Sequence, residues 1–374
     1  MNACISILLE QLSMLFILSA YMGGGFLLQY ILDQGVLIHL EWCYDLYGLL
    51  NEFLLFYTIL FFLFQVLIKI QPKEGFAVLN RIFKETRERY GNWKEVGPFL
   101  VVYTAIPPFL SMYSSLKQAI PIIYPFSWDR TFMKMDFFLH LGHHPWKLLQ
   151  IFMGYPTITK FMDYIYTSWH PVLFTVIIWQ AWSSKRRSRA QFFNSLLFLF
   201  IINGTILATL FSSAGPCYYQ YTVARSGNPY QSQMQYLASV HVANFLYAVE
   251  GHKTLWWLYT EGIKMPYVGI SAMPSIHVGA AVLFAILGWR TNWILGFGFT
   301  VYALLIQFGS VHLGWHYAID GYFSAILAFV LWKGSGWVVM TPNEGGGSGI
   351  SNRGKSRYRA NNSSAEKHIG TNCG

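Results

Sequence analysis

The sequence has 374 residues, of which 54% are hydrophobic, 18% aromatic and only 11% charged. A soluble globular domain carries about 25% charged residues, so this composition excludes an ordinary soluble protein and indicates an integral membrane protein. The formal net charge is +9. The basic residues are distributed along the chain as expected for the orientation of membrane helices, so no nucleic-acid partner is expected.

Apolar segments of the length that a membrane-spanning helix needs, about 20 residues, recur along the whole chain. The fold class predicted from them is an all-α polytopic membrane protein with about eight transmembrane helices. The run of three glycines at 23–25 is expected to interrupt the first helix. The predicted spans are 12–32, 53–70, 99–117, 164–182, 193–212, 273–289, 293–311 and 315–333.

The distribution of Lys and Arg predicts the orientation, because these residues accumulate on the cytoplasmic side of a membrane. With the N-terminus inside, eighteen of the 26 basic residues fall in cytoplasmic segments and eight fall on the other side. The basic run at 185–189 is accordingly interpreted as a topology signal rather than a binding patch. This orientation leaves the C-terminus in the cytoplasm.

Two long loops remain on the non-cytoplasmic side, at 121–163 and 213–270. Structureless loops of this length are unusual, and apolar and aromatic residues run through both, so we expect helices that lie in the membrane interface or under the bundle. The tail after Met340 is rich in Gly, Ser and Asn and is predicted to be disordered.

Three polar residues lie at the non-cytoplasmic ends of predicted helices. His277 lies at the start of the sixth helix, and His316 and Asp320 at the start of the eighth. Ionisable residues at membrane depth are costly and usually functional. Because the charge count places all three at one membrane face, we expect them to converge.

The types and spacing of these residues fit phosphoryl transfer. His316 and Asp320 are four apart and share one helix face, so the carboxylate can fix the imidazole tautomer and leave the other nitrogen free to attack phosphorus. His277 is the candidate acid and base for the leaving and entering oxygens. Ser275 and the first amides of the sixth helix suit a phosphate, and His312 is either a supporting residue or a ligand to a phosphate oxygen.

Each piece also has an ordinary structural explanation. His-x-x-x-Asp is often only a satisfied polar pair, and Pro-Ser-x-His begins many helices. His312 and His316 have the spacing of a metal pair, but no cysteine or carboxylate-rich partner set accompanies them. Taken together, on one face and in this order, the pieces favour a catalytic site.

Two sequence stretches carry a family resemblance. Pro274-Ser275-Ile276-His277 and the stretch from Gly309 to Asp320, GSVHLGWHYAID, resemble the second and third signatures of the phosphatidic acid phosphatase type 2 superfamily. The His-Tyr-x-x-Asp form, which includes Tyr317, resembles the inositol phosphorylceramide synthase branch. The superfamily includes lipid phosphatases, vanadium haloperoxidases and sphingolipid synthases.

The resemblance implies an enzyme that needs no metal or organic cofactor, with a site facing away from the cytosol. It implies that His316 is the nucleophile, Asp320 its orienting carboxylate and His277 the acid and base. Beside these roles, we expect Ser275, His312, Tyr317 and Arg225 to bind the phosphate or the substrate. The predicted domains are two N-terminal helices with a basic loop at 1–97, a six-helix catalytic core at 98–337 and a basic cytoplasmic tail at 338–374.

The sequence also departs from the lipid phosphatase pattern. It contains no Arg-Pro dipeptide, and Gly309-Ser310 stands where Ser-Arg opens the third signature, so two phosphate-binding cations are missing. Another cation must neutralise the phosphoryl oxygens. The candidates on the second long loop are Arg225, Lys253, Lys264, His241 and His252. Arg225 is preferred because it follows Gly215-Pro216-Cys217-Tyr218-Tyr219, which resembles the loop before the catalytic helices in the inositol phosphorylceramide synthase branch.

Further polar positions have open interpretations. His170, before Pro171 in the fourth span, is either a functional intramembrane residue or a structural one bonded to backbone opened by the proline. The stretch Trp128-Asp129-Arg130 and Asp136 could line the mouth of the site, but a surface salt bridge is the favoured interpretation.

The predicted function is an integral membrane lipid phosphotransferase, whose partners are membrane lipids; the oligomeric state is not predicted. A lipid phosphate phosphatase that uses the same site is the alternative. A transporter or non-catalytic membrane protein, in which the histidines form a proton relay, is the alternative of another class, although inverted repeats typical of transporters are not evident.

Overall fold

A computed structural model describes residues 3–32, 37–69, 77–223 and 227–339. These residues form helices and connecting loops, and no strand occurs among them. The all-α polytopic fold is therefore confirmed. The predicted disordered tail after Met340 lies outside the described residues.

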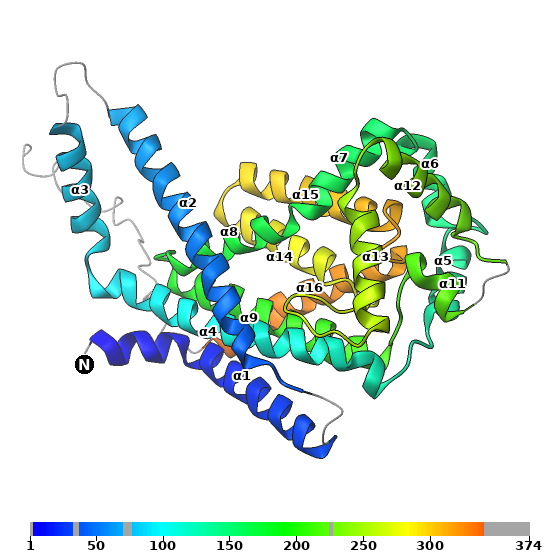
Figure 1. Cartoon of the computed structure of the whole chain (residues 1–374). Coiled ribbons are helices and arrows are strands. Elements are labelled where there is room, and N and C mark those ends of the chain that lie inside the picture. The colour runs from blue at the N-terminus through cyan, green and yellow to red at the C-terminus, as the bar shows by residue number, and fades with distance from the viewer. Residues whose placement is uncertain (1–2, 33–36, 70–76, 224–226, 340–374) are drawn as a thin grey trace, which may run out of the picture. The chain divides into compact units, whose positions relative to one another are not determined.

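The helices of the N-terminal third precede the long loops (Figure 1). They are α1 Ala3–Ile31, η2 Leu40–Trp42, α2 Cys43–Lys69, α3 Ala77–Tyr90 and α4 Trp93–Ile123. The middle of the chain contains α5 Asp129–Leu139, α6 Pro145–Met153, α7 Pro156–Thr167, α8 Trp169–Ala181, α9 Arg186–Phe198, η3 Leu199–Leu207 and α10 Ala208–Leu210. The remaining elements are η4 Pro216–Tyr218, α11 Tyr219–Thr222, α12 Gln231–Ala243, α13 Tyr247–Thr260, α14 Ile276–Thr291, α15 Trp293–His312 and α16 Ala318–Val338.

Five helical stretches in the described ranges are long and apolar enough to cross a membrane. They are Gln11–Ile31, Leu40–Gln65, Val96–Ile123, Arg186–Leu210 and Trp293–His312. The other three predicted spans are also helical, and they correspond to α7 with α8, to the shorter apolar α14, and to α16.

The prediction that the glycine run interrupts the first helix is wrong. α1 continues through it to Ile31, and α1 packs against α4. A β-carbon added at Gly25 would collide with the side chain of Met112 in α4. Small residues permit this close approach of helices in membranes, so Gly25 serves packing.

The fourth predicted span is two helices rather than one. α7 ends at Thr167 and α8 begins at Trp169, with Ser168 between them. Pro171 lies in the first turn of α8, where its missing N–H has no helical partner to lose. The break directs Tyr166 and His170, from the two sides of the junction, toward the same cavity.

The core of the bundle is built around α14, which packs against α15, α16, α9, η3 and α8. Its side chains Ala280, Ala281, Leu283 and Phe284 are fully buried. Asn292 joins α14 to α15 and caps the latter, because its Oδ1 accepts a hydrogen bond from the Leu295 amide at 2.9 Å. This packing fixes the first turn of α14, which carries His277.

The two long loops contain the helices expected of them. α5, α6 and α7 occupy the first loop and α11, α12 and α13 the second. α6 and α7 pack against α15, α5 packs against α16, and α13 packs against α7. The loop helices therefore surround the helix ends that carry the predicted site residues.

Candidate active site

His316 lies in the short loop between α15 and α16, and its ring orientation is set by the backbone. Its Nδ1 is 2.8 Å from the carbonyl oxygen of Ala272. Because a carbonyl oxygen only accepts hydrogen bonds, Nδ1 carries the proton and Nε2 carries the free lone pair. The sequence pattern did not reveal this acceptor, which comes from the loop before α14.

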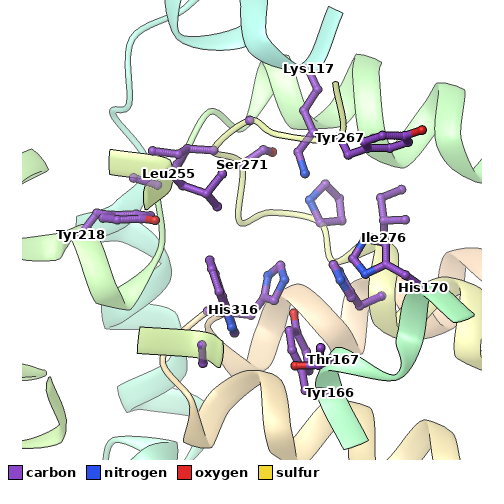
Figure 2. Close-up of a pocket in the computed structure, with 18 of the residues that line it drawn as sticks. Lys117, Tyr166, Thr167, His170, Tyr218, Leu255, Tyr267, Ser271, Ile276 and His316 are labelled. Carbon is purple, nitrogen blue, oxygen red and sulfur yellow. The ribbon is translucent and has the colours of Figure 1, made fainter. Parts of the chain in front are cut away.

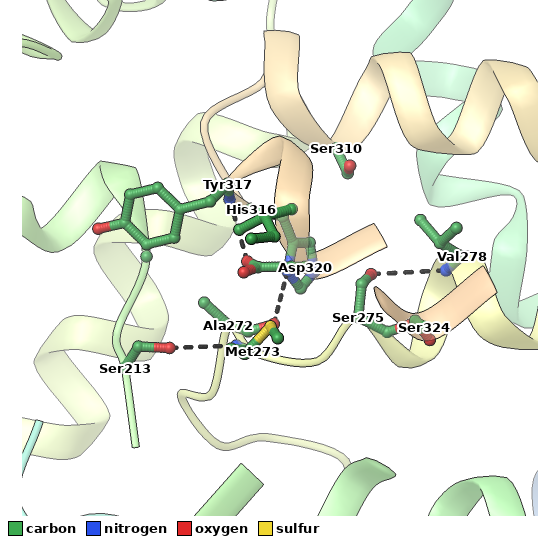
Figure 3. A network of polar contacts seen from close by, with 12 residues as sticks. Ser213, Ala272, Met273, Ser275, Val278, Ser310, His316, Tyr317, Asp320 and Ser324 are labelled. Atoms are coloured by element: carbon green, nitrogen blue, oxygen red, sulfur yellow. Dashed lines mark hydrogen bonds and ion pairs between the residues drawn. The ribbon is translucent and has the colours of Figure 1, made fainter. Parts of the chain in front are cut away.

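Asp320 approaches the same ring nitrogen from the first turn of α16. Its Oδ2 lies 3.3 Å from His316 Nδ1 and accepts a hydrogen bond from the Tyr317 amide at 3.0 Å. The side chain is completely buried. Figure 3 shows Asp320 and Ala272 on the same side of the His316 ring. Nδ1–H is thus shared between a close carbonyl and a more distant carboxylate.

His277 lies beside His316, in the first turn of α14. The two ring centroids are 6.2 Å apart. The His277 ring stacks on Tyr166, with centroids 4.9 Å apart, and contacts the Trp169 ring at 4.2 Å. Trp169 Nε1 also donates a hydrogen bond to the His277 carbonyl oxygen. Aromatic packing from the α7–α8 junction therefore holds this imidazole.

Both imidazoles line one cavity of about 260 Å³. His170 also lines it, with its ring centroid 5.9 Å from that of His277 in an edge-on arrangement. Lys117 of α4 reaches into the cavity from the side opposite His316 (Figure 2). Among the described residues, Lys117 has no carboxylate within ion-pair distance, so its positive charge is available to an anion in the cavity.

The predicted phosphate-side residues lie elsewhere. Ser275 is fully buried and caps α14 through its hydroxyl and the Val278 amide. His312 Nε2 is hydrogen-bonded to the Thr159 hydroxyl at 2.9 Å. Tyr317 donates its hydroxyl to a carboxylate. None of the three lines the cavity, so their roles on the phosphate side stay predictions, and Arg225 lies outside the described residues.

The other cationic candidates do not line the cavity either. His252 is buried against the Trp315 ring, and this burial lowers its pKa to about 3, so it is neutral at physiological pH. Lys253 is exposed and lies 3.9 Å from Glu250 Oε2. Lys264 is exposed, and His241 accepts a hydrogen bond from the Leu246 amide.

Asp129 and Asp136 are buried rather than in surface salt bridges. The Asp129 carboxylate accepts hydrogen bonds from the amides of Ala214 and Gly215 at 3.0 and 2.8 Å. The Asp129 carboxylate also accepts the Tyr317 hydroxyl at 2.9 Å. These bonds fix the loop after α10 against the loop before α16.

Two further buried carboxylates make the same kind of contact. Asp136 accepts the amides of Ala318 and Ile319 at 2.7 and 2.9 Å, at the start of α16. Burial raises the pKa of Asp136 to about 7, against the opposing effect of the Ala318 hydrogen bond. Asp163 accepts the amides that begin α13. We call Asp129, Asp136 and Asp163 the carboxylate clamps, because each holds two adjacent amides of a segment next to the cavity.

The Gly215-Pro216-Cys217-Tyr218-Tyr219 loop packs directly against the segment that carries His316. The Cys217 amide donates a hydrogen bond to the Gly314 carbonyl oxygen at 3.0 Å. Gly215 has φ of +103°, and a β-carbon there would lie 2.6 Å from the Trp315 carbonyl oxygen. Only glycine fits this position without strain.

Sequence reasoning missed Lys117 and Tyr166. Lys117 is the last residue of the predicted span 99–117. In the sequence analysis it contributes only as one of the eight basic residues on the non-cytoplasmic side. α4 continues to Ile123, which leaves this lysine inside an apolar helix, and an intramembrane cation is itself a functional signal. Tyr166 has no such signal, because an aromatic residue in an apolar segment is ordinary.

Comparison with known proteins supplies a family for this site. A family model described as the PAP2 superfamily matches residues 130–333. That range contains His277, His316 and Asp320 and excludes α1 to α4. No match was found among curated proteins or among solved structures. The chain therefore belongs to the PAP2 superfamily, whose members are phosphatases or phosphotransferases.

Proposed function

We propose that this protein is an integral membrane lipid phosphotransferase that uses a phosphohistidine intermediate on His316. The observation that carries the proposal is the orientation of that ring. Nδ1 donates its hydrogen bond to the Ala272 carbonyl oxygen, so Nε2 is the nitrogen that is free to attack. The cavity that His316 lines is also lined by His277. Neutral imidazole with one fixed proton is the reactive form of a histidine nucleophile.

The reaction proceeds in two displacements. His316 Nε2 attacks phosphorus and forms a P–N bond, while the P–O bond to the lipid breaks and His277 donates a proton to the departing oxygen. The acceptor hydroxyl then loses its proton to His277 as its oxygen attacks phosphorus and the P–N bond breaks. His316 is regenerated, and each histidine ends in its starting protonation state.

The acceptor is proposed to be a lipid hydroxyl, as in inositol phosphorylceramide synthases. Support comes from the His-Tyr-x-x-Asp form at His316 to Asp320 and from the missing Arg-Pro and Ser-Arg cations, which that branch also lacks. The excess of Lys and Arg on the opposite side supports a site at the non-cytoplasmic face and a cytoplasmic C-terminus.

An acceptor assay tests this function. Purified protein in detergent is given phosphatidylinositol with and without ceramide, and both the phosphorylated ceramide product and free inositol phosphate are measured. We expect product formation that depends on ceramide, with little release of inositol phosphate in its absence. Release at the same rate without ceramide would identify water as the acceptor, which is the lipid phosphatase type of reaction.

Lys117 is proposed to neutralise the phosphoryl oxygens. Its Lys117→Met variant keeps most of the side-chain length but removes the charge, and it should lower turnover by about 10²–10³-fold, the usual loss when one group that stabilises transition-state charge is removed. Lys117→Arg should retain part of the activity, and inhibition by inorganic phosphate should weaken in the methionine variant.

The matched control for Lys117 is Lys253→Met, a lysine that is exposed and does not line the cavity. It should leave both turnover and phosphate inhibition unchanged. Equal losses in the two methionine variants would mean that Lys117 has no special role at the phosphoryl group.

A further inference from the structure

A second cavity lies next to the first and extends to α2. Its volume is about 440 Å³, and we call it the α2 chamber. At one end its wall is formed by Lys117, His170 and His277, which also line the site cavity. The rest of the wall is mainly apolar, and it includes Leu49, Phe53, Leu110, Leu173, Phe174 and Phe200.

α2 is held firmly as one wall of this chamber. The Phe53 ring stacks on the Phe174 ring of α8, with centroids 5.5 Å apart, and a hydrogen bond joins the hydroxyls of Tyr57 and Thr175. On the other side, the Tyr103 hydroxyl of α4 donates a hydrogen bond to Asn51 Oδ1 at 2.9 Å. α2 is thus tied to both neighbouring helices, α4 and α8.

The chamber has the chemistry of an amphipathic ligand. A cation and two imidazoles lie at one end, which suits a phosphate, and aliphatic and aromatic side chains lie along the rest, which suits a hydrocarbon chain. A bilayer is already as apolar as these side chains. The chamber therefore contributes little hydrophobic driving force, and it selects a chain by shape and packing.

We propose that the α2 chamber holds an acyl chain of the phosphorylated lipid donor while the phosphate lies between Lys117 and His316. Leu49 and Phe53, on a helix outside the matched family region, then determine which acyl chains are accepted. This inference rests on the proposed function, because it takes the substrate to be a phospholipid.

Leu49→Trp tests the inference by filling the chamber. We expect it to lower transfer from dipalmitoyl phosphatidylinositol to ceramide by about tenfold, the lower end of the selectivity that one misfitting group produces in an apolar pocket. Transfer from dihexanoyl phosphatidylinositol, whose short chains do not reach the added indole, should be unchanged. Phe53→Ala, which enlarges the chamber, should shift the preference toward longer or bulkier chains.

The control is Leu55→Trp on the same helix, because Leu55 is 62% exposed and does not line the chamber. It should alter neither substrate. If Leu49→Trp reduces both substrates equally, or neither, while the melting temperature stays at the wild-type value, the chamber does not select acyl chains.

A binding measurement separates this inference from the proposed chemistry. His316→Ala protein in phosphatidylcholine nanodiscs is photolabelled with phosphatidylinositol that carries a diazirine in its acyl chain. We expect labelling of α2 that excess unlabelled phosphatidylinositol competes away and that Leu49→Trp abolishes. This result would support the chamber even if the wild-type protein transferred nothing from phosphatidylinositol. Labelling unaffected by Leu49→Trp would overturn the inference even if the wild-type protein were active.

Discussion

Replacement of His316 by alanine is expected to lower turnover by on the order of 10⁴-fold or more, as removal of a nucleophile does in enzymes that form a covalent intermediate. The loss should be accompanied by disappearance of an acid-labile phosphoenzyme. Rapid quenching after addition of ³²P-labelled lipid phosphate, followed by acid and base treatment of the protein, measures this directly.

His312→Gln is the matched control, because His312 lies four residues before His316, at the end of α15, and is absent from the cavity lining. Glutamine can keep the hydrogen bond that His312 makes with Thr159. The control should retain the phosphoenzyme and most of the activity. Full turnover in His316→Ala, or a phosphoenzyme that persists in it, would show that another residue is the nucleophile.

Replacement of His277 by alanine is expected to reduce lipid turnover by about 10²–10⁴-fold, the usual contribution of a general acid or base. The effect should depend on the leaving group. With p-nitrophenyl phosphate the departing phenolate needs no proton, so phosphorylation of His316 should survive in the variant. Transfer to the acceptor still requires a base, so the phosphoenzyme should accumulate.

The accumulation is measured as a burst of p-nitrophenolate equal to the enzyme concentration, followed by a slow steady state. His143→Ala serves as the control, because His143 is exposed and does not line the cavity, and it should behave as wild type. A His277→Ala variant that shows no burst, or that turns over lipid and nitrophenyl substrates with equal losses, would argue against the acid and base role.

Most of the fold could be predicted from the sequence because long apolar runs are a strong signal of membrane helices. It also pointed to His277, His316 and Asp320 as candidates, since polar residues at helix ends are conspicuous among apolar ones, and the structure brings the three side chains together. The orientation of His316 could not be predicted. It depends on the carbonyl oxygen of Ala272, and every residue offers a carbonyl to some partner.

The roles of Ser275, His312 and Tyr317 on the phosphate side stay predictions. The structure places none of the three in the cavity lining, although each lies close in the chain to a residue that does. Adjacent residues on a helix point in different directions, so a neighbour of a cavity residue usually faces the protein interior. Lys117 reaches the cavity from α4 and lies more than 150 residues before His277 in the sequence. Residues so far apart in the chain leave no local sequence pattern that shows they line the same cavity.

The carboxylate clamps have a consequence for how the protein is made. Asp129, Asp136 and Asp163 are synthesised before the amides that they hold, which belong to segments near residues 214, 247 and 318. A nascent chain that stops short of Ala214 carries three acidic groups whose native partners do not yet exist. The pocket can therefore close only late in biosynthesis, when the beginning of α16 has left the ribosome and engaged Asp136.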